Sequence, residues 1–177
     1  MDTFECIRRR HSYRGAYLDT PVPRDDLRRI MEAGLAAPSG CHKQTTYLAG
    51  IDDPALLDSV TALVKKSGFG GTRAPAGICV FTREIPAYGN CFFNVQDYSA
   101  AIENLLLAVT ALGYASCWIE GQVTGDPEHR SRISELLNAP AEYAPVAFLP
   151  VGIPAVEVTG PEYRPFGERA WFNVWGG

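Results

Sequence analysis

Hydrophobic and polar positions recur with a helical period in several stretches of the chain. Between residues 24 and 36 the apolar residues share one face and the first turn is acidic, which predicts an amphipathic helix. That face carries Leu27, Ile30, Met31, Gly34 and Leu35. A second helix begins with Asp53 as a cap and Pro54 in the first helical position, and should end at Gly68.

The segment from about Val95 to Leu112 is unusually apolar. Between Tyr98 and Leu112 only Glu103 and Asn104 carry a charge or an amide. A helix that is apolar on nearly all sides must be covered on nearly all sides. We therefore expect a central helix, packed partly against a second subunit and stopped by Gly113.

The remaining patterns are shorter. They predict two further helices, over residues 3–9 and 126–137, and three strands, over residues 76–82, 115–119 and 144–152. The order of elements predicts an α+β layered domain, with a central and mainly antiparallel sheet flanked by helices. The βαβ repetition of a doubly wound fold is missing, as is any Gly-x-Gly-x-x-Gly run. We expect residues 1–177 to form a single domain.

The aromatic residues gather near the C-terminal end, at Tyr163, Phe166, Trp171, Phe172 and Trp175. Such a segment should lie on a protein surface, its own or a partner's. The net charge of −4 argues against a role on nucleic acids or membranes. We see no secretory signal and no membrane-spanning run, so a cytoplasmic protein is expected. Five scattered cysteines without C-x-x-C spacing fit reduced thiols, and no metal site is predicted.

Positive charge is nevertheless concentrated near the N-terminus, at Arg8, Arg9, Arg10 and Arg14. Residues 10–14 read Arg-His-Ser-Tyr-Arg, so two planar guanidinium groups and a hydroxyl stand at alternate positions. On extended backbone such residues point the same way, and this set suits one small oxyanion. The alternative is an ordinary solvated end of a helix. A second candidate is the Pro/Ser/Gly turn at residues 38–44, which can present backbone N–H groups to a ligand.

Several stretches, in order, resemble the nitroreductase family of FMN-dependent NAD(P)H oxidoreductases, which are intertwined homodimers. Residues 10–14 resemble its Arg-x-Ser-x-Arg/Lys motif, and residues 37–44 (Ala-Pro-Ser-Gly-Cys-His-Lys-Gln) resemble its Ala-Pro-Ser-x-x-Asn-x-Gln turn. Residues 104–113 are similar to the dimer-core helix, and residues 117–121 (Cys-Trp-Ile-Glu-Gly) to the loop at flavin N5. Val-Gly-Ile-Pro at 151–154 and Arg-Pro-Phe-Gly-Glu at 164–168 resemble the closing signatures.

The resemblance implies FMN as cofactor, NAD(P)H as electron donor and flavin sites at the interface of a homodimer. It implies that the flavin contacts are Arg10, His11, Ser12, Arg14, Pro38, Ser39, Gly40, His42, Gln44, Ile119, Glu120, Gly121 and Arg164. Basic side chains would hold the phosphate and the ring edge, and the turn would lie beside the flavin of the other subunit. Hydride passes between cofactors and an electron-poor planar acceptor, so no catalytic side chain is named.

The chain also departs from the family pattern. His42 replaces the usual Asn of the turn, Thr45-Thr46 replaces a common Pro-Trp, and the region between residues 66 and 98 is short. These departures leave two alternatives open. One is a specialised flavin dehydrogenase or dehalogenase of the same fold, and the other is a flavin-binding protein without turnover. The sequence identifies neither the physiological acceptor nor the preference for NADH or NADPH.

Overall fold

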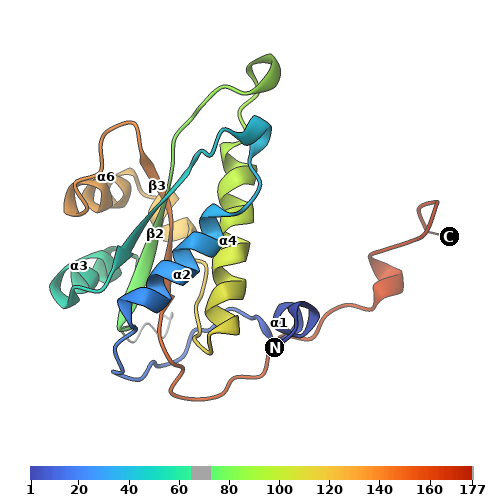
Figure 1. Cartoon of the computed structure of the whole chain (residues 1–177), viewed down its shortest axis with the longest axis horizontal. Coiled ribbons are helices and arrows are strands. Elements are labelled where there is room, and N and C mark those ends of the chain that lie inside the picture. Colours follow the sequence, from blue (N-terminus) through green and yellow to red (C-terminus); the bar gives the residue numbers. More distant parts are fainter. Residues whose placement is uncertain (65–72, 177) are drawn as a thin grey trace.

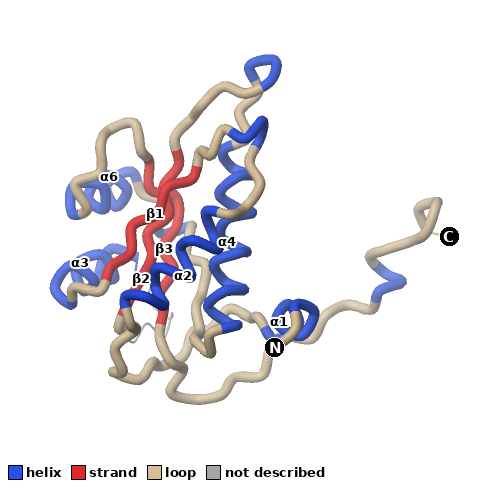
Figure 2. Tube along the Cα trace, viewed as in Figure 1, coloured by secondary structure: helices blue, strands red, loops and turns tan. Residues whose placement is uncertain are grey.

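The sheet at the centre of the fold has three antiparallel strands. In this computed structural model, which describes residues 1–64 and 73–176, they lie in the order β1-β2-β3. The strands are β1 (Thr46–Ile51), β2 (Ala76–Thr82) and β3 (Ala144–Val151). Every residue of the central strand β2 is buried. Figure 2 shows the sheet in red, with helices on both of its faces.

Successive side chains of β2 enter two different hydrophobic cores, because side chains alternate between the faces of a strand. Ile78 and Val80 pack against α2 (Arg24–Leu35) and the long helix α4 (Asn94–Ala111). Cys79 and Phe81 face the second core, which is formed with α3 (Pro54–Val64), α5 (Gly121–Thr124) and α6 (Pro127–Leu136). Figure 1 shows these two layers of helices on either side of the strands.

A short N-terminal helix, α1 (Thr3–Arg9), lies beside the C-terminal half of α4. Its one buried side chain is Cys6, whose thiol donates a hydrogen bond to the carbonyl oxygen of Leu107 at 3.2 Å. Three single-turn 3₁₀ helices complete the elements: η1 (Gly40–His42), η2 (Tyr88–Asn90) and η3 (Phe166–Glu168). Helix α1 contacts α4 at one place, and the 3₁₀ helix η1 contacts it at another.

Most elements that were predicted from periodicity and caps are present. The predicted bounds of α1 and β2 are those of the structure, and the main bounds of α2, α4, α6 and β3 differ by about one residue. Asp53 caps α3 as expected, because its carboxylate accepts the N–H of Leu56 at 2.8 Å. The predicted end of this helix at Gly68 lies outside the described residues.

Two strand assignments were wrong. Residues 115–119 do not form a strand, because only Ala115 and Ile119 make isolated bridges to β3, at Gly152 and Phe148. The edge strand β1 was missed, since its short apolar run is interrupted by Gly50 and follows directly on a turn. Leu35, which was placed on the buried face of α2, is mostly exposed because the helix ends there.

Beyond Pro154 the chain leaves the folded body. Figure 1 shows this tail in orange and red, extending past α1 to a C-terminus far from the sheet. Most of its large apolar side chains are exposed, with Trp175 at 87%, whereas Trp171 is half-buried. Trp171 and Trp175 contact each other with ring centroids 4.2 Å apart. Within one chain the aromatic tail therefore lacks the protein surface that the sequence predicted for it.

Across residues 1–64 and 73–176, none of the helices is long and apolar enough to cross a membrane.

Gly77 tests how tightly the second core is packed. A Cβ atom at this position would lie 2.5 Å from Cε2 of Phe148 and 3.1 Å from Cδ1 of Leu57. Both of these side chains are buried and cannot move aside. We expect Gly77→Ala to lower the free energy of unfolding by about 1–3 kcal/mol, the usual cost of overpacking. Chemical denaturation measures this, and Gly167→Ala, where no atom lies within 4 Å of the new Cβ, should change little.

Candidate functional site

The Arg10–Arg14 segment lies beside residues 116–118, although the two are distant in sequence. The backbone N–H of Tyr13 donates a hydrogen bond to the carbonyl oxygen of Ser116 at 2.8 Å. The hydroxyl of Ser12 is hydrogen-bonded to the thiol of Cys117. The structure thus places two of the three predicted site segments next to each other in a single chain.

Ser12 and Arg14 both act on Cys117. Burial raises the pKa of the Cys117 thiol, while the Arg14 guanidinium and the Ser12 hydroxyl act in the opposite direction. Burial prevails, so this thiol stays protonated at neutral pH. The Arg14 side chain is exposed at the surface next to this buried group.

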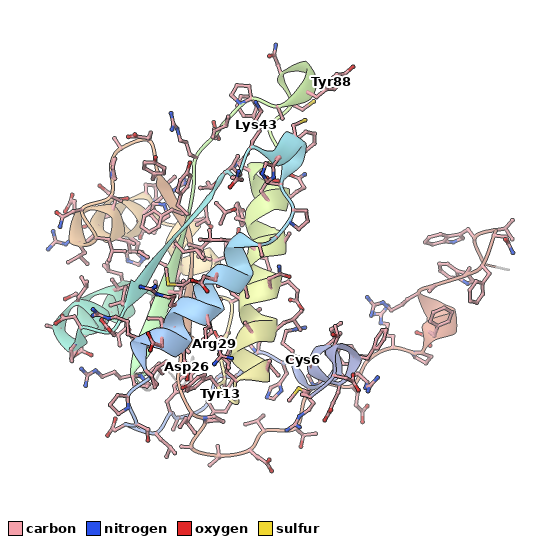
Figure 3. All side chains as sticks on the ribbon, viewed as in Figure 1. Cys6, Tyr13, Asp26, Arg29, Lys43 and Tyr88 are labelled. Carbon is pink, nitrogen blue, oxygen red and sulfur yellow. The ribbon has the colours of Figure 1, made fainter. Side chains whose placement is uncertain are left out.

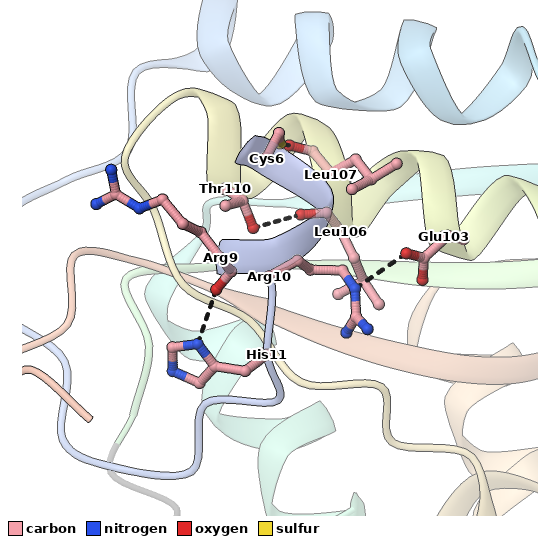
Figure 4. A network of polar contacts seen from close by, with 8 residues as sticks. All are labelled: Cys6, Arg9, Arg10, His11, Glu103, Leu106, Leu107 and Thr110. Atoms are coloured by element: carbon pink, nitrogen blue, oxygen red, sulfur yellow. Dashed lines mark hydrogen bonds and ion pairs between the residues drawn. The ribbon is translucent and has the colours of Figure 1, made fainter. Parts of the chain in front are cut away.

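Arg10 turns toward α4 instead. It is the C-cap of α1, and its Nε lies 2.9 Å from Oε1 of Glu103. Figure 4 shows the two terminal nitrogens of this guanidinium pointing away from Glu103. A fork with two N–H donors on its open side is suited to a second anion. Sequence reasoning did not assign this role to Glu103, although it is the one acidic residue between Tyr98 and Leu112.

A cavity of about 550 Å³ adjoins Arg10 and His11. It lies between the end of α1, the C-terminal part of α4 and residues 156–160 of the tail, and its lining includes Arg8 and Arg9. The Nδ1 of His11 is 3.0 Å from the carbonyl oxygen of Arg9, whereas its Nε2 is buried without a hydrogen bond. The hydroxyl of Ser116, which also lines the cavity, lacks a partner among the described residues. Such atoms need a polar ligand or water.

The turn at residues 38–44 is closed by its own hydrogen bonds. The N–H groups of His42 and Lys43 donate to the carbonyl oxygens of Ser39 and Gly40, and the N–H of Gln44 donates to the Ser39 hydroxyl. The expectation that this turn presents a series of N–H groups to a ligand is therefore wrong for most of its residues. What it presents are exposed side chains, among them those of His42 and Gln44.

Ile119, Glu120 and Gly121 occupy the link between a bridge to β3 and the start of α5. Ile119 exchanges two backbone hydrogen bonds with Phe148, at 3.1 and 2.8 Å. The Glu120 carboxylate accepts a hydrogen bond from the Tyr98 hydroxyl at 3.2 Å. Around a Cβ at Gly121 there is open space to 4 Å. The N–H groups of Glu120 and Gly121 donate to no described group.

Arg164 lies in the exposed tail. Within the part of the chain that the structure describes, it forms no ion pair or hydrogen bond. Shortly before it, Gly160 passes His11 at ordinary contact distance. The tail thus passes the end of α1 before it reaches Arg164.

The predicted segments occupy two ends of α4. Figure 3 shows Lys43 of the turn near one end of this helix, and Tyr13 and Cys6 near the other. Asp97 contacts the turn and Leu107 contacts α1, and these residues are separated along the helix axis by about 15 Å. One chain therefore does not bring the turn and the arginine segment together.

The five cysteines differ in exposure, which gives a chemical test of the fold. Cys41 and Cys91 are exposed, whereas burial raises the pKa of the Cys79 thiol to about 12. Iodoacetamide reacts with thiolates, so we expect carboxamidomethylation of Cys41 and Cys91 in the native protein and none of Cys79. Peptide mass spectrometry of native and denatured samples measures this. Rapid labelling of Cys79 in the native protein would contradict its burial in the second core.

Comparisons with known proteins identify the family and the fold of the chain. A family model described as the nitroreductase family matches residues 7–68 and 58–153. A protein of Methanothermobacter thermautotrophicus, provisionally named NADH dehydrogenase/NAD(P)H nitroreductase, is 29% identical over 164 residues, covering 88% of this chain and 78% of that protein.

Two solved structures extend the likeness over nearly the whole chain. A provisionally named NADH dehydrogenase/NAD(P)H nitroreductase from Parabacteroides distasonis has a TM-score of 0.82 at 26% identity, with 98% of both chains covered. A nitroreductase with bound FMN from Bacteroides fragilis has a TM-score of 0.76 at 27% identity, covering 98% of this chain and 100% of that one.

Proposed function

Because the chain belongs to the nitroreductase family, we propose that it is an FMN-dependent oxidoreductase with NAD(P)H as electron donor. Its acceptor in this proposal is an electron-poor planar molecule, such as a nitroaromatic compound or a quinone. The observation that carries the proposal is the family match, which spans the arginine segment, the turn and residues 117–121. The FMN in the similar Bacteroides fragilis structure and the names of the relatives support it.

The residues present fit the phosphate of FMN. A phosphate monoester carries nearly two negative charges at neutral pH. Arg14 and the open fork of Arg10 would supply the opposite charge, and Ser12 would add a neutral hydrogen bond. His11 and Ser116 have buried polar atoms without partners close by. In this arrangement Arg164 would reach the same phosphate from the tail.

The ring of the flavin would be oriented by backbone at Glu120 and Gly121. The N–H groups there are unused, and the space around Gly121 is open, so backbone can approach a ligand closely. When bound, FMN supplies the hydride-transfer chemistry, and the chain needs no catalytic side chain of its own. Since donor and acceptor would use the same place in turn, ping-pong kinetics are expected.

We further propose a homodimer in which each flavin site is shared. The arginine segment and the turn lie at opposite ends of α4 in one chain. If the α4 helices of two copies pack antiparallel across a twofold axis, the turn of one copy approaches the arginine segment of the other. This places Pro38, Ser39, Gly40, His42 and Gln44 of one subunit beside the flavin held by its partner.

Spectroscopy of the purified protein tests the proposed function. We expect yellow protein with the absorbance of FMN, which NADH or NADPH bleaches under anaerobic conditions and a quinone or nitroaromatic compound restores. Parallel lines in double-reciprocal plots would support the ping-pong order. Flavin that stays oxidised with excess NADH and NADPH would favour a flavin-binding protein without turnover. Reduction without reoxidation by these acceptors would favour a specialised dehydrogenase or dehalogenase.

A further inference from the structure

Asp97, in the first turn of α4, is a buried carboxylate that is not among the predicted site residues. It is only 5% exposed. Its Oδ1 accepts the backbone N–H of Gly40 at 2.8 Å, and its Oδ2 accepts the hydroxyl of Thr45 at 2.7 Å. A buried charge is costly unless its oxygens receive hydrogen bonds, and here each oxygen has a donor. The two donors stand on either side of residues 41–44.

The segment between these donors is strained. Cys41, His42 and Gln44 have φ angles of 49°, 56° and 50°, in the left-handed region that residues with a Cβ disfavour. Such a conformation persists only when its surroundings hold it. The Asp97 carboxylate joins both ends of this segment to the rigid helix α4.

Other contacts of the same turn add to those that Asp97 makes. A Cβ at Gly40 would lie 2.5 Å from Cδ2 of Phe93, so the backbone approaches α4 closely at this point. On the other side, the carbonyl oxygen of Thr45 accepts the N–H of Arg83 at 3.0 Å and the hydroxyl of Thr82 at 3.2 Å. The turn is thereby tied to the end of β2 as well as to α4.

The anchored turn directs polar side chains outward. His42 and Gln44 are exposed, and the Nε2 atoms of the two side chains are 3.1 Å apart. They belong to the turn that Lys43 marks in Figure 3, at the end of α4 away from Cys6 and Tyr13. Their positions depend on the left-handed backbone between Gly40 and Thr45.

We propose that Asp97 is a positioning residue for the flavin site of the partner subunit. Its carboxylate fixes the turn so that His42 and Gln44 meet a flavin bound by the arginine segment of the other chain. This inference rests on the proposed function and deepens it, since it assigns the role to a residue outside the family motifs quoted above. Asp97 touches neither flavin nor substrate, and its effect passes through the turn.

The affinity for FMN tests the proposal directly. Asp97→Ala and Thr45→Val should each raise the dissociation constant of FMN, by about tenfold to a hundredfold for the charged partner. Thr45→Ser keeps the hydroxyl and should retain the wild-type affinity. Asp52→Ala is the matched control, because it removes a carboxylate that accepts two hydrogen bonds from Arg24, both at 2.7 Å, without touching the turn. Dilution of the holoprotein, followed by the fluorescence of released FMN, measures the constant.

Mixed dimers separate positioning across the interface from a general loss of stability. In a dimer of one Asp97→Ala chain and one Arg14→Gln chain, one site carries both changes and the other carries neither. We expect one flavin per mixed dimer, bound with wild-type affinity. If Asp97 acted on the flavin site of its own chain, or only on stability, both sites of the mixed dimer would be impaired.

Three results would overturn the inference while leaving the proposed function intact. They are wild-type flavin affinity in both Asp97→Ala and Thr45→Val, an equal loss in Asp52→Ala, or two impaired sites in the mixed dimer. Should Asp97→Ala fail to fold, Thr45→Val decides the question alone. A wild-type protein that binds no FMN would instead remove the proposed function.

Discussion

Neutralising Arg10 and Arg14 together should raise the dissociation constant of FMN by about a hundredfold to ten-thousandfold. Hydrogen bonds to charged groups contribute about 1.5–3 kcal/mol each, and each 1.4 kcal/mol is a factor of ten in affinity. Arg14 stands next to Cys117, in the segment that leads to Glu120 and Gly121, and Arg10 lines a cavity that Ser116 also lines. Arg10→Gln/Arg14→Gln removes both charges and both guanidinium forks and leaves a shorter, neutral polar side chain at each position. Titration of apoprotein with FMN, followed by quenching of flavin fluorescence, measures the effect.

The control for this double variant is Arg132→Gln. Arg132 is an exposed arginine of α6 that pairs with Glu135 at 2.8 Å, remote from the arginine segment. The Arg132→Gln substitution should leave the affinity for FMN unchanged. Equal affinities of the wild-type protein and the double variant would show that the phosphate is held elsewhere. The double variant should also lose most of the dependence of binding on salt, since that dependence reports the charged contacts.

If the proposed homodimer forms, ending the chain after Pro154 should leave a monomer at micromolar concentration. The removed tail carries Tyr163, Phe166, Phe172, Val174 and Trp175, all exposed in the single chain. Burial of a large apolar side chain contributes about 1.5–3 kcal/mol. Loss of several such contacts at two symmetric places would raise the dissociation constant of the dimer by more than about a thousandfold.

Sedimentation equilibrium of the shortened chain measures this change. A chain that ends after Trp175 keeps the aromatic residues and should remain dimeric. If the chain without its tail is still a dimer, the tail is not part of the interface, and α4 alone would have to supply it.

The elements that local chemistry determines were predictable. The caps at Asp53 and Asp126 and the apolar face of α2 fixed three helices, because each signal is read within one or two turns. The strand β1 was missed and residues 115–119 were misassigned, since pairing partners far along the chain decide which apolar run becomes a strand. Ala115 and Ile119 contact β3 without continuing its ladder.

The candidate site was likewise predictable only where local motifs determine it. The motifs located the arginine segment and the turn, but not what holds them. Glu103 and Asp97 are distant in sequence from the groups they contact, and no local pattern pairs them with Arg10 or Gly40. The alternating arrangement of Arg10, Ser12 and Arg14 was likewise incomplete as a description. Arg10 has extended backbone angles as the C-cap of α1, but its Nε pairs with Glu103 of α4, whereas Arg14 lies beside Cys117.

The left-handed backbone at Cys41, His42 and Gln44 has a consequence for how this turn tolerates change. Glycine at any of these positions would adopt the same angles without steric cost, so it would relieve a penalty of about 1–2 kcal/mol per residue. If stability alone had determined the sequence, glycine would be expected at these positions. The chain carries a thiol, an imidazole and an amide there instead. The sequence that would make this loop most stable therefore differs from the sequence that provides these functional groups.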